Sequence, residues 1–336
     1  MNPRTFPLLR PGHDHAAMRF GVPVWHDRRM DADSTFQGSL DPVLRRAFRV
    51  WRGVSWGLKS LLGKPRTLLV ELRWRLGDEI MALPVIDALG AAYPGDRLYV
   101  LTNYPDLFEG RNHMAGINTI PASVDWYLLL RGAARNEYRG AVYARKAGLP
   151  LPDAPPRLMY ENWATAMLDA VRDRSKPLIA VAPETTWRTK QWPREHWEAL
   201  CRVLRARGAK VVELGQHGLD LPVDYALAGK TSVREAACVL HEALVLVSCD
   251  NGLMHLARAA GTPVVALFGP TDPDILLRPH PDFVPLRSGL ACHGYWNRLN
   301  PAPDPERCPL DHECCLSSIT VDTVFESVVQ RMVRTV

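Results

Sequence analysis

The sequence lacks any long apolar run. No stretch of its 336 residues approaches the roughly 18 consecutive apolar residues of a membrane-spanning helix. The first 30 residues also lack a compact apolar segment followed by small residues, which is the pattern of a secretory signal. We therefore expect a cytoplasmic protein.

Cysteine is too sparse for a disulfide framework. The chain has seven cysteines, and three of them are scattered through its second half. The other four lie near the C-terminus, at Cys292, Cys308, Cys314 and Cys315. Thiolates can hold a structural metal, but no Cys-x-x-Cys pair is present, so this pattern favours free thiols or an occasional disulfide.

The excess of positive charge is small. Forty-one Lys and Arg against 36 Asp and Glu leave a formal charge of +5, which favours an anionic ligand or a membrane surface. It is too diffuse to indicate a nucleic-acid partner. The hydrophobic content of 47% and charged content of 23% are typical of a globular protein, and the length predicts two domains.

Three common nucleotide and catalytic motifs are missing. No G-x-G-x-x-G follows a predicted strand, and neither G-x-x-x-x-G-K-[ST] nor G-x-S-x-G occurs. Interpretations as a dinucleotide oxidoreductase, a P-loop ATPase or an α/β-hydrolase therefore lose their main support.

The first 65 residues form a separate region. Residues 1–41 show no sustained period, whereas 42–64 repeat apolar residues at helical spacing with basic residues between them, after an Asp41-Pro42 start signal. Such a helix can lie peripherally in a membrane interface beside anionic lipid or pack on the next domain, and the pattern fits both equally.

The rest of the chain alternates strands with helices. Strands are predicted at 67–72, 97–102, 178–182, 210–214, 244–248 and 263–268, and helices at 79–92, 160–172, 194–207, 232–242 and 253–260. This alternation indicates parallel sheets. We expect two Rossmann-like α/β domains, 66–172 and 173–336, facing each other across a cleft.

Ligands of open parallel sheets bind beyond the carboxyl ends of the strands, so the loops there carry the candidate residues. In the first loop, Gly77 permits a close approach and Asp78 stands at a helix start. An Asp there is more often an N-cap than a catalyst. The helix N-terminus should lower its pKa, and an ionised carboxylate can take a proton from a hydroxyl.

Three later loops carry phosphate-binding chemistry. Thr185, Thr186 and Lys190 precede a helix, where they can bind phosphate or be solvated. The run Asp250-Asn251-Gly252 offers backbone N–H groups to a diphosphate. His255 follows one turn later and, taken alone, is more simply a core residue. The fourth loop is a turn by composition, and it holds Gly269 and Thr271 where a phosphate would pass.

Taken together and in order, these loops resemble glycosyltransferase family 9, the ADP-heptose:lipopolysaccharide heptosyltransferases. The matching segments are 68–89, 183–197, 227–232 and 249–273. The resemblance implies a GT-B fold and metal-independent transfer with inversion at the sugar carbon. It also implies ADP-heptose as the donor substrate, with no cofactor.

The resemblance assigns roles residue by residue. Asp78 falls on the general base, with Gly77 and Arg75 on the acceptor side, and Lys190 falls on the lysine that contacts the donor phosphates, beside Thr185 and Thr186. The family's donor-binding D-x-G-x-x-H segment falls on Asp250, Gly252 and His255. Two departures stand out: Asn251 replaces a threonine, and the segment 117–158 is shorter than in the family, which predicts a shortened N-terminal domain.

We therefore expect an inverting glycosyltransferase that transfers heptose to a hydroxyl of a lipopolysaccharide core sugar or of a protein side chain. One alternative is another nucleotide-sugar donor on the same fold. A second is a catalytically idle carbohydrate-binding or scaffold protein. The position of Asp78 discriminates, because a working base must face Lys190 and Asp250 across one cleft.

Overall fold

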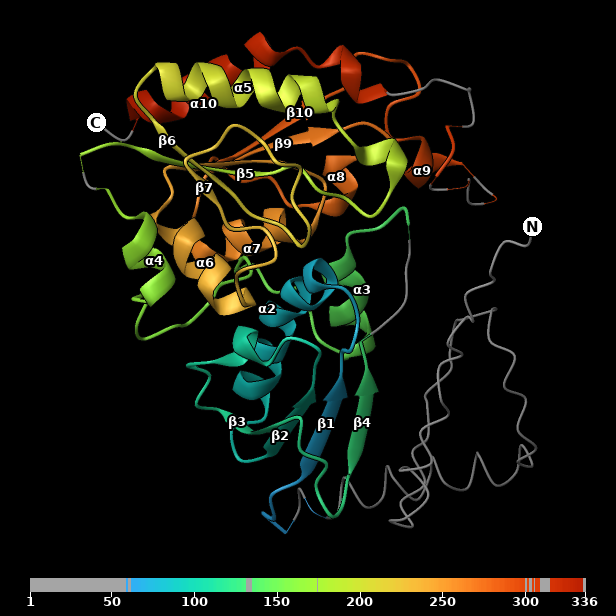
Figure 1. The fold of residues 1–336 in the computed structure, drawn as a ribbon. Helices are drawn as coiled ribbons and strands as arrows, with labels where there is room; N and C mark the ends of the chain where they lie inside the picture. Colours follow the sequence, from blue (N-terminus) through green and yellow to red (C-terminus); the bar gives the residue numbers. More distant parts are fainter. Residues whose placement is uncertain are drawn as a thin grey trace, which may run out of the picture.

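The computed structural model describes residues 59, 62–130, 135–173, 175–299, 301, 304, 306–308 and 315–334. These residues form two parallel sheets with helices between and around them (Figure 1). Apart from Lys59 and residues 62–65, the predicted N-terminal arm and basic helix lie outside this part of the chain. No helix within it has the length and apolar character needed to cross a membrane.

The first sheet has four strands in the order β3-β2-β1-β4, all parallel. The strands are β1 (Thr67–Glu71), β2 (Arg97–Leu101), β3 (Met114–Ile117) and β4 (Trp126–Leu129). Helices α2 (Leu76–Ala92) and α3 (Arg139–Lys146) lie side by side on one face (Figure 1). Alternation along β1 directs Leu68 and Val70 to the core that includes these helices.

The second sheet has six strands in the order β10-β9-β8-β5-β6-β7. The strands are β5 (Leu178–Ala182), β6 (Lys210–Glu213), β7 (Tyr225–Ala226), β8 (Val245–Cys249), β9 (Val264–Phe268) and β10 (Phe283–Arg287). Every residue of β5, β8 and β9 is buried, because helices cover both faces, as is usual for parallel sheets.

Four helices make these two outer layers. Helices α5 (Arg194–Ala206) and α10 (Val321–Arg334) cover one face, and α6 (Val233–Glu242) and α7 (Gly252–Ala260) cover the other (Figure 1). Shorter helical elements connect the rest: η2 (Pro105–Phe108), α4 (Ala166–Val171), η3 (Arg188–Lys190), α8 (Pro273–Leu276), α9 (Tyr295–Arg298) and η4 (Cys315–Ser318).

The two units meet where α2 crosses α7 (Figure 1). One continuous apolar core runs through both. The crossing is close because a Cβ at Gly77 would lie 2.6 Å from Cδ2 of His255, and one at Gly252 would lie 3.1 Å from Cβ of Leu76. The connecting segment also joins the second unit, since Leu158 N–H donates to Ala259 O over 2.9 Å.

The predicted alternation is confirmed, with shifted bounds. The first helix begins at Leu76, three residues before its predicted start, so Gly77 and Asp78 belong to the helix and not to the preceding loop. The predicted helix 160–172 is wrong over its first six residues, because Thr165 caps α4 through its side chain and helix begins only at Ala166. The segment 117–158 contains β4 and α3, which the sequence pattern did not resolve.

Candidate active site between the two sheets

Asp78 lies where the first sheet faces the second. It is the third residue of α2, it is only 9% exposed, and the helix has no side-chain cap at its N-terminus. The interpretation of Asp78 as an N-cap is therefore wrong: Arg75 occupies the cap position. The adjacent loop is fixed by Glu79 instead, whose carboxylate accepts hydrogen bonds from Trp74 N at 2.9 Å and Asn103 N at 3.2 Å.

The expectation of a lowered pKa for Asp78 is also wrong. Burial between the two units raises the pKa of this carboxyl above its ordinary value. The positive charges of Arg139 and Arg75 oppose that rise without cancelling it, and Arg139 Nε lies 3.2 Å from Asp78 Oδ1. The helix N-terminus is thus the weaker influence here, because loss of water around a carboxylate outweighs a partial charge.

Lys190 and Asp250 form a buried ion pair on the facing side. Lys190 Nζ lies 2.5 Å from Asp250 Oδ2, and Thr271 Oγ1 donates to the same oxygen over 2.8 Å. Burial raises the pKa of Asp250, but Lys190 and these hydrogen bonds reverse the effect and hold it below its usual value. Lys190 also lies 3.9 Å over the ring of Trp187, a cation–π contact. Three of the predicted donor-binding residues therefore meet at one point.

Asn251 shapes the start of α7. Its side-chain oxygen accepts from Met254 N over 3.1 Å and so caps the helix, while its Nδ2 donates to Ala182 O and Glu184 O, both at 3.0 Å. The residue that departs from the family pattern thus ties α7 to the end of β5. The N-terminal backbone of α7 is held beside Asp250, as an anion-binding helix start requires.

His255 is buried, but at the boundary between the units and not in the interior of one. Its ring packs on Gly77, and burial lowers its pKa to about 4. The imidazole is therefore neutral near pH 7. Asp250 opposes this shift without overcoming it. Gly77, predicted to permit a close approach, permits the approach of this ring.

Asp78 senses the charges of both Asp250 and Lys190, the first raising and the second lowering its pKa. Together with the contact between Gly77 and His255, this brings the predicted base and the predicted donor-binding residues into one site. Gly269, another predicted site residue, is also closely packed, because a Cβ there would collide with Sγ of Cys315.

Other predicted residues lie further out. Thr185 Oγ1 donates to Trp187 O over 2.8 Å and so shapes its own loop. Thr186 and Arg75 are exposed. No contact joins these three side chains to the Lys190–Asp250 pair.

Sequence reasoning missed Arg139 and an aromatic pair. Arg139 begins α3, in a segment without a recognisable motif, so no signal marked it. Trp187 and Trp296 are half-buried with ring centroids 4.5 Å apart, and Arg135 of the first unit lies 5.4 Å over Trp296. The Trp187 ring beside a lysine was a visible signal, since aromatic rings attract cations.

The cysteine tail lies only partly within the residues that the structure describes. Cys292 and Cys308 are half-buried and Cys315 is buried, whereas Cys314 lies outside the described residues. No group of three or more Cys, His, Asp or Glu side chains in the described chain can hold a metal ion.

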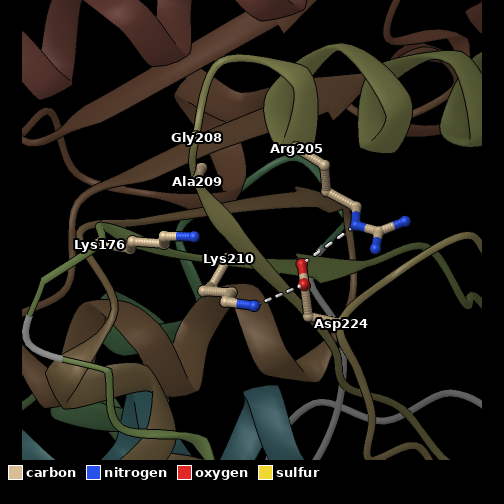
Figure 2. A pocket seen from close by; sticks show the side chains of 6 residues that line it. All are labelled: Lys176, Arg205, Gly208, Ala209, Lys210 and Asp224. Carbon is tan, nitrogen blue, oxygen red and sulfur yellow. Dashed lines mark hydrogen bonds and ion pairs between the residues drawn. The ribbon is translucent and has the colours of Figure 1, made fainter.

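Figure 2 shows a separate surface pocket of about 140 Å³. Lys176, Arg205 and Lys210 line it around Asp224, which pairs with Lys210 at 3.0 Å and with Arg205 at 3.2 Å. It lies beside the amino end of β6, whereas sheets of this type bind ligands at the carboxyl ends. It contains none of the predicted site residues.

Two parallel α/β units that share a polar site where their strand-end loops meet define the GT-B class of glycosyltransferase fold. Solved structures agree: TibC, an iron-containing dodecameric glycosyltransferase from enterotoxigenic E. coli, superposes with a TM-score of 0.66 at 18% identity, over 81% of this chain and 77% of that one. The ADP-heptose lps heptosyltransferase II of E. coli superposes with a TM-score of 0.59 at 18% identity, over 80% of this chain and 99% of that one.

The family resemblance is confirmed by sequence. Residues 137–282 match the model of glycosyltransferase family 9 (heptosyltransferase). Lipopolysaccharide heptosyltransferase 2 of Salmonella typhimurium is 26% identical over 200 residues, which are 52% of this chain and 58% of the relative. Lipopolysaccharide heptosyltransferase 1 of Pseudomonas aeruginosa is 33% identical over 142 residues, 39% of each chain. The chain thus matches less than two thirds of the length of these relatives, and Asp78 precedes the matched family segment.

Proposed function

We propose that the protein is an inverting heptosyltransferase that uses ADP-heptose as its donor. The observation that carries the proposal is the meeting of Asp78 with the Lys190–Asp250 pair between the two units. Transfer from a nucleotide diphosphate to a hydroxyl requires a base for the hydroxyl and a positively charged site for the diphosphate. Here the two lie on opposite sides of one boundary.

In this scheme Asp78 accepts the proton of the acceptor hydroxyl while the acceptor oxygen attacks the anomeric carbon from the face opposite the nucleotide. A new carbon–oxygen bond forms, the bond from that carbon to the diphosphate breaks, and ADP leaves. Lys190 and the N–H groups at the start of α7 stabilise the charge that develops on the diphosphate. The neutral His255 adds no charge and packs the two units together.

The raised pKa of Asp78 suits this role. A general base works best when its pKa approaches the working pH, provided that it remains ionised. Burial moves Asp78 in that direction, and Arg139 limits the movement. An idle scaffold has no need of an acidic side chain buried at the boundary, because a buried carboxylate costs stability.

The acceptor is a hydroxyl of a lipopolysaccharide core sugar or of a protein side chain, and the chemistry above is the same for both. A cytoplasmic location, with or without peripheral contact of residues 42–64 with the inner membrane, fits both acceptors. The half-exposed Trp187 and Trp296 offer aromatic surface beside Lys190, on which a sugar ring can rest.

Calorimetric titration of the full chain tests the donor. ADP and ADP-heptose are compared with UDP, GDP and their sugars, each with and without a chelator. We expect selective binding of ADP-heptose that the chelator does not change. Selective binding of a uridine or guanosine diphosphate sugar would mean that the donor is not ADP-heptose, and would leave the proposal of a glycosyltransferase standing. Failure to bind any nucleotide would favour the idle scaffold.

A further inference from the structure

We propose that Arg139 is a positioning residue for Asp78: its guanidinium pairs with Oδ1 of the carboxylate, holds the carboxylate in place and keeps it ionised for the acceptor hydroxyl. The inference rests on the proposed function, in which Asp78 is the base. It concerns a residue of α3, a segment without a recognisable motif.

The geometry of the pair supports this assignment. Arg139 Nε lies 3.2 Å from Asp78 Oδ1, and the two side chains are 17% and 11% exposed. A guanidinium is planar and permanently charged, so it fixes the plane of a carboxylate better than an ammonium does. Behind the pair, the fully buried Tyr143, one turn along α3, hydrogen-bonds the Arg139 side chain. The guanidinium is therefore held from two sides.

The position of Arg139 in its own helix favours a role at the site. It is the first residue of α3, and the first turn contains no acidic residue. Positive charge is unfavourable at a helix N-terminus, because the unpaired N–H groups there carry partial positive charge. Arg139 thus lowers the stability of helix α3. The ion pair with Asp78 of α2 compensates for this loss. The last turn, where Arg145 and Lys146 lie, is the favourable place for cations.

Among the charged groups around Asp78, Arg139 lowers the pKa of its carboxyl most strongly. Burial raises the pKa of Asp78, and among the groups that lower it Arg139 precedes Arg75 and Lys190. The other titratable groups that face Asp78 or its helical neighbours are Glu79 of α2, Tyr104 before η2, Tyr143 of α3, and Asp250 and His255 at α7. Asp250 raises the pKa of Asp78, as burial does. Glu79 is also acidic and is more deeply buried than Asp78. Neither carboxylate can therefore replace the positive charge of the arginine.

Arg139→Met tests the proposal, because it keeps most of the side-chain length and removes the charge. An arginine beside a carboxylate lowers its pKa by about one to three units, so we expect the acidic limb of kcat/KM to move up by about that much. Arg139→Lys should recover part of the shift. Arg145→Met is the matched control, since Arg145 lies on the same helix, is 60% exposed and pairs with Glu137.

Titration of [γ-13C]aspartate-labelled full-length protein by NMR supplies a readout that needs no catalysis. The Asp78 signal is assigned by its loss in Asp78→Asn, and its midpoint should rise in Arg139→Met and stay unchanged in Arg145→Met. If Arg139→Met leaves both the Asp78 titration midpoint and the acidic limb of kcat/KM unchanged but lowers the Tm, then Arg139 only ties α3 to α2. That result would overturn the inference. Absence of transfer by the wild type would count against the proposed function instead, and the NMR titration would still decide the role of Arg139.

Discussion

At the scale of single residues, the site is a set of buried charges that compensate one another. Asp78 pairs with Arg139 within the first unit, and Asp250 pairs with Lys190 within the second. Each carboxylate thus has a cation from its own side, so neither unit brings an uncompensated charge to the boundary. Breaking a buried pair by removing one partner costs far more than the pair contributes, which makes these residues sensitive to substitution.

Asp78→Asn should lower the rate of transfer by about 10²- to 10⁴-fold, the usual contribution of a general base. Donor affinity should stay within about threefold of wild type, because the base acts on the acceptor and not on the nucleotide. Initial rates and calorimetric titration of the donor measure the two quantities. Asp169→Asn, on the exposed face of α4, is the control. An unchanged rate in Asp78→Asn would remove the proposed base.

His255 makes stability depend on pH. Its pKa is about 4 in the folded protein against an ordinary 6.5, so the unfolded chain binds the extra proton between these values. The free energy of unfolding therefore falls as the pH is lowered from 6.5 towards 4, by at most about 3 kcal/mol at 1.36 kcal/mol per unit. Asp250, lowered below its usual 3.8, acts below this window, and the raised Asp78 acts in the opposite sense.

Urea unfolding at several pH values isolates the His255 contribution. The slope of unfolding free energy against pH between 4 and 6.5 should be smaller in His255→Gln than in wild type. His217→Gln is the control, because that side chain is 82% exposed. Equal slopes in all three proteins would show that His255 is not held neutral by burial.

At the scale of elements, the crossing of α2 and α7 fixes the site. Each helix has a glycine facing the other, Gly77 towards His255 and Gly252 towards Leu76, so the N-terminal turns approach closely. Asp78 and Asp250 flank this crossing. The distance between the two halves of the site therefore depends on helix packing and not on flexible loops.

Gly77→Ala should lower the free energy of unfolding by about 1–3 kcal/mol, the usual cost of overpacking a buried contact. The same change in an open helix position would stabilise, because alanine is the better helix former. Gly95→Ala is the control, since a Cβ there meets no atom within 4 Å. Denaturant unfolding measures both, and a Gly77→Ala protein as stable as wild type would contradict the packing described.

Sequence pattern was sufficient for six strands, β1, β2, β5, β6, β8 and β9, and for the helices that alternate with them, but not for β7, β10 or α10. The strands β5, β8 and β9 are continuous apolar runs bounded by polar loops, and such runs identify buried parallel strands from the sequence alone. The short β3, β4 and α3 were not predicted, because segments of four and eight residues are too short to show a clear period.

The site residues could be predicted more easily than their electrostatics. Motif order located Asp78, Lys190 and Asp250, which the structure brings together. The direction of the Asp78 pKa shift could not be predicted, because it depends on burial between segments far apart in sequence. The same reason hid Arg139, whose importance comes from the residue it faces.

At the scale of the whole molecule, we propose that the nucleotide binds at the boundary between the two units and not in the basic pocket of Figure 2. Both places have lysines, so net charge cannot distinguish them. Lys190 has Asp250, Thr271 and the start of α7 beside it, whereas Lys176 is exposed next to the pocket's Arg205 and Lys210.

Calorimetric titration of ADP-heptose into wild type, Lys190→Ala and Lys176→Ala tests this assignment most directly. Hydrogen bonds to charged groups contribute about 1.5–3 kcal/mol, so Lys190→Ala should weaken binding by about tenfold to a hundredfold, while Lys176→Ala should bind as wild type does. Wild-type affinity in Lys190→Ala, or loss of binding in Lys176→Ala, would contradict the site described between the two sheets.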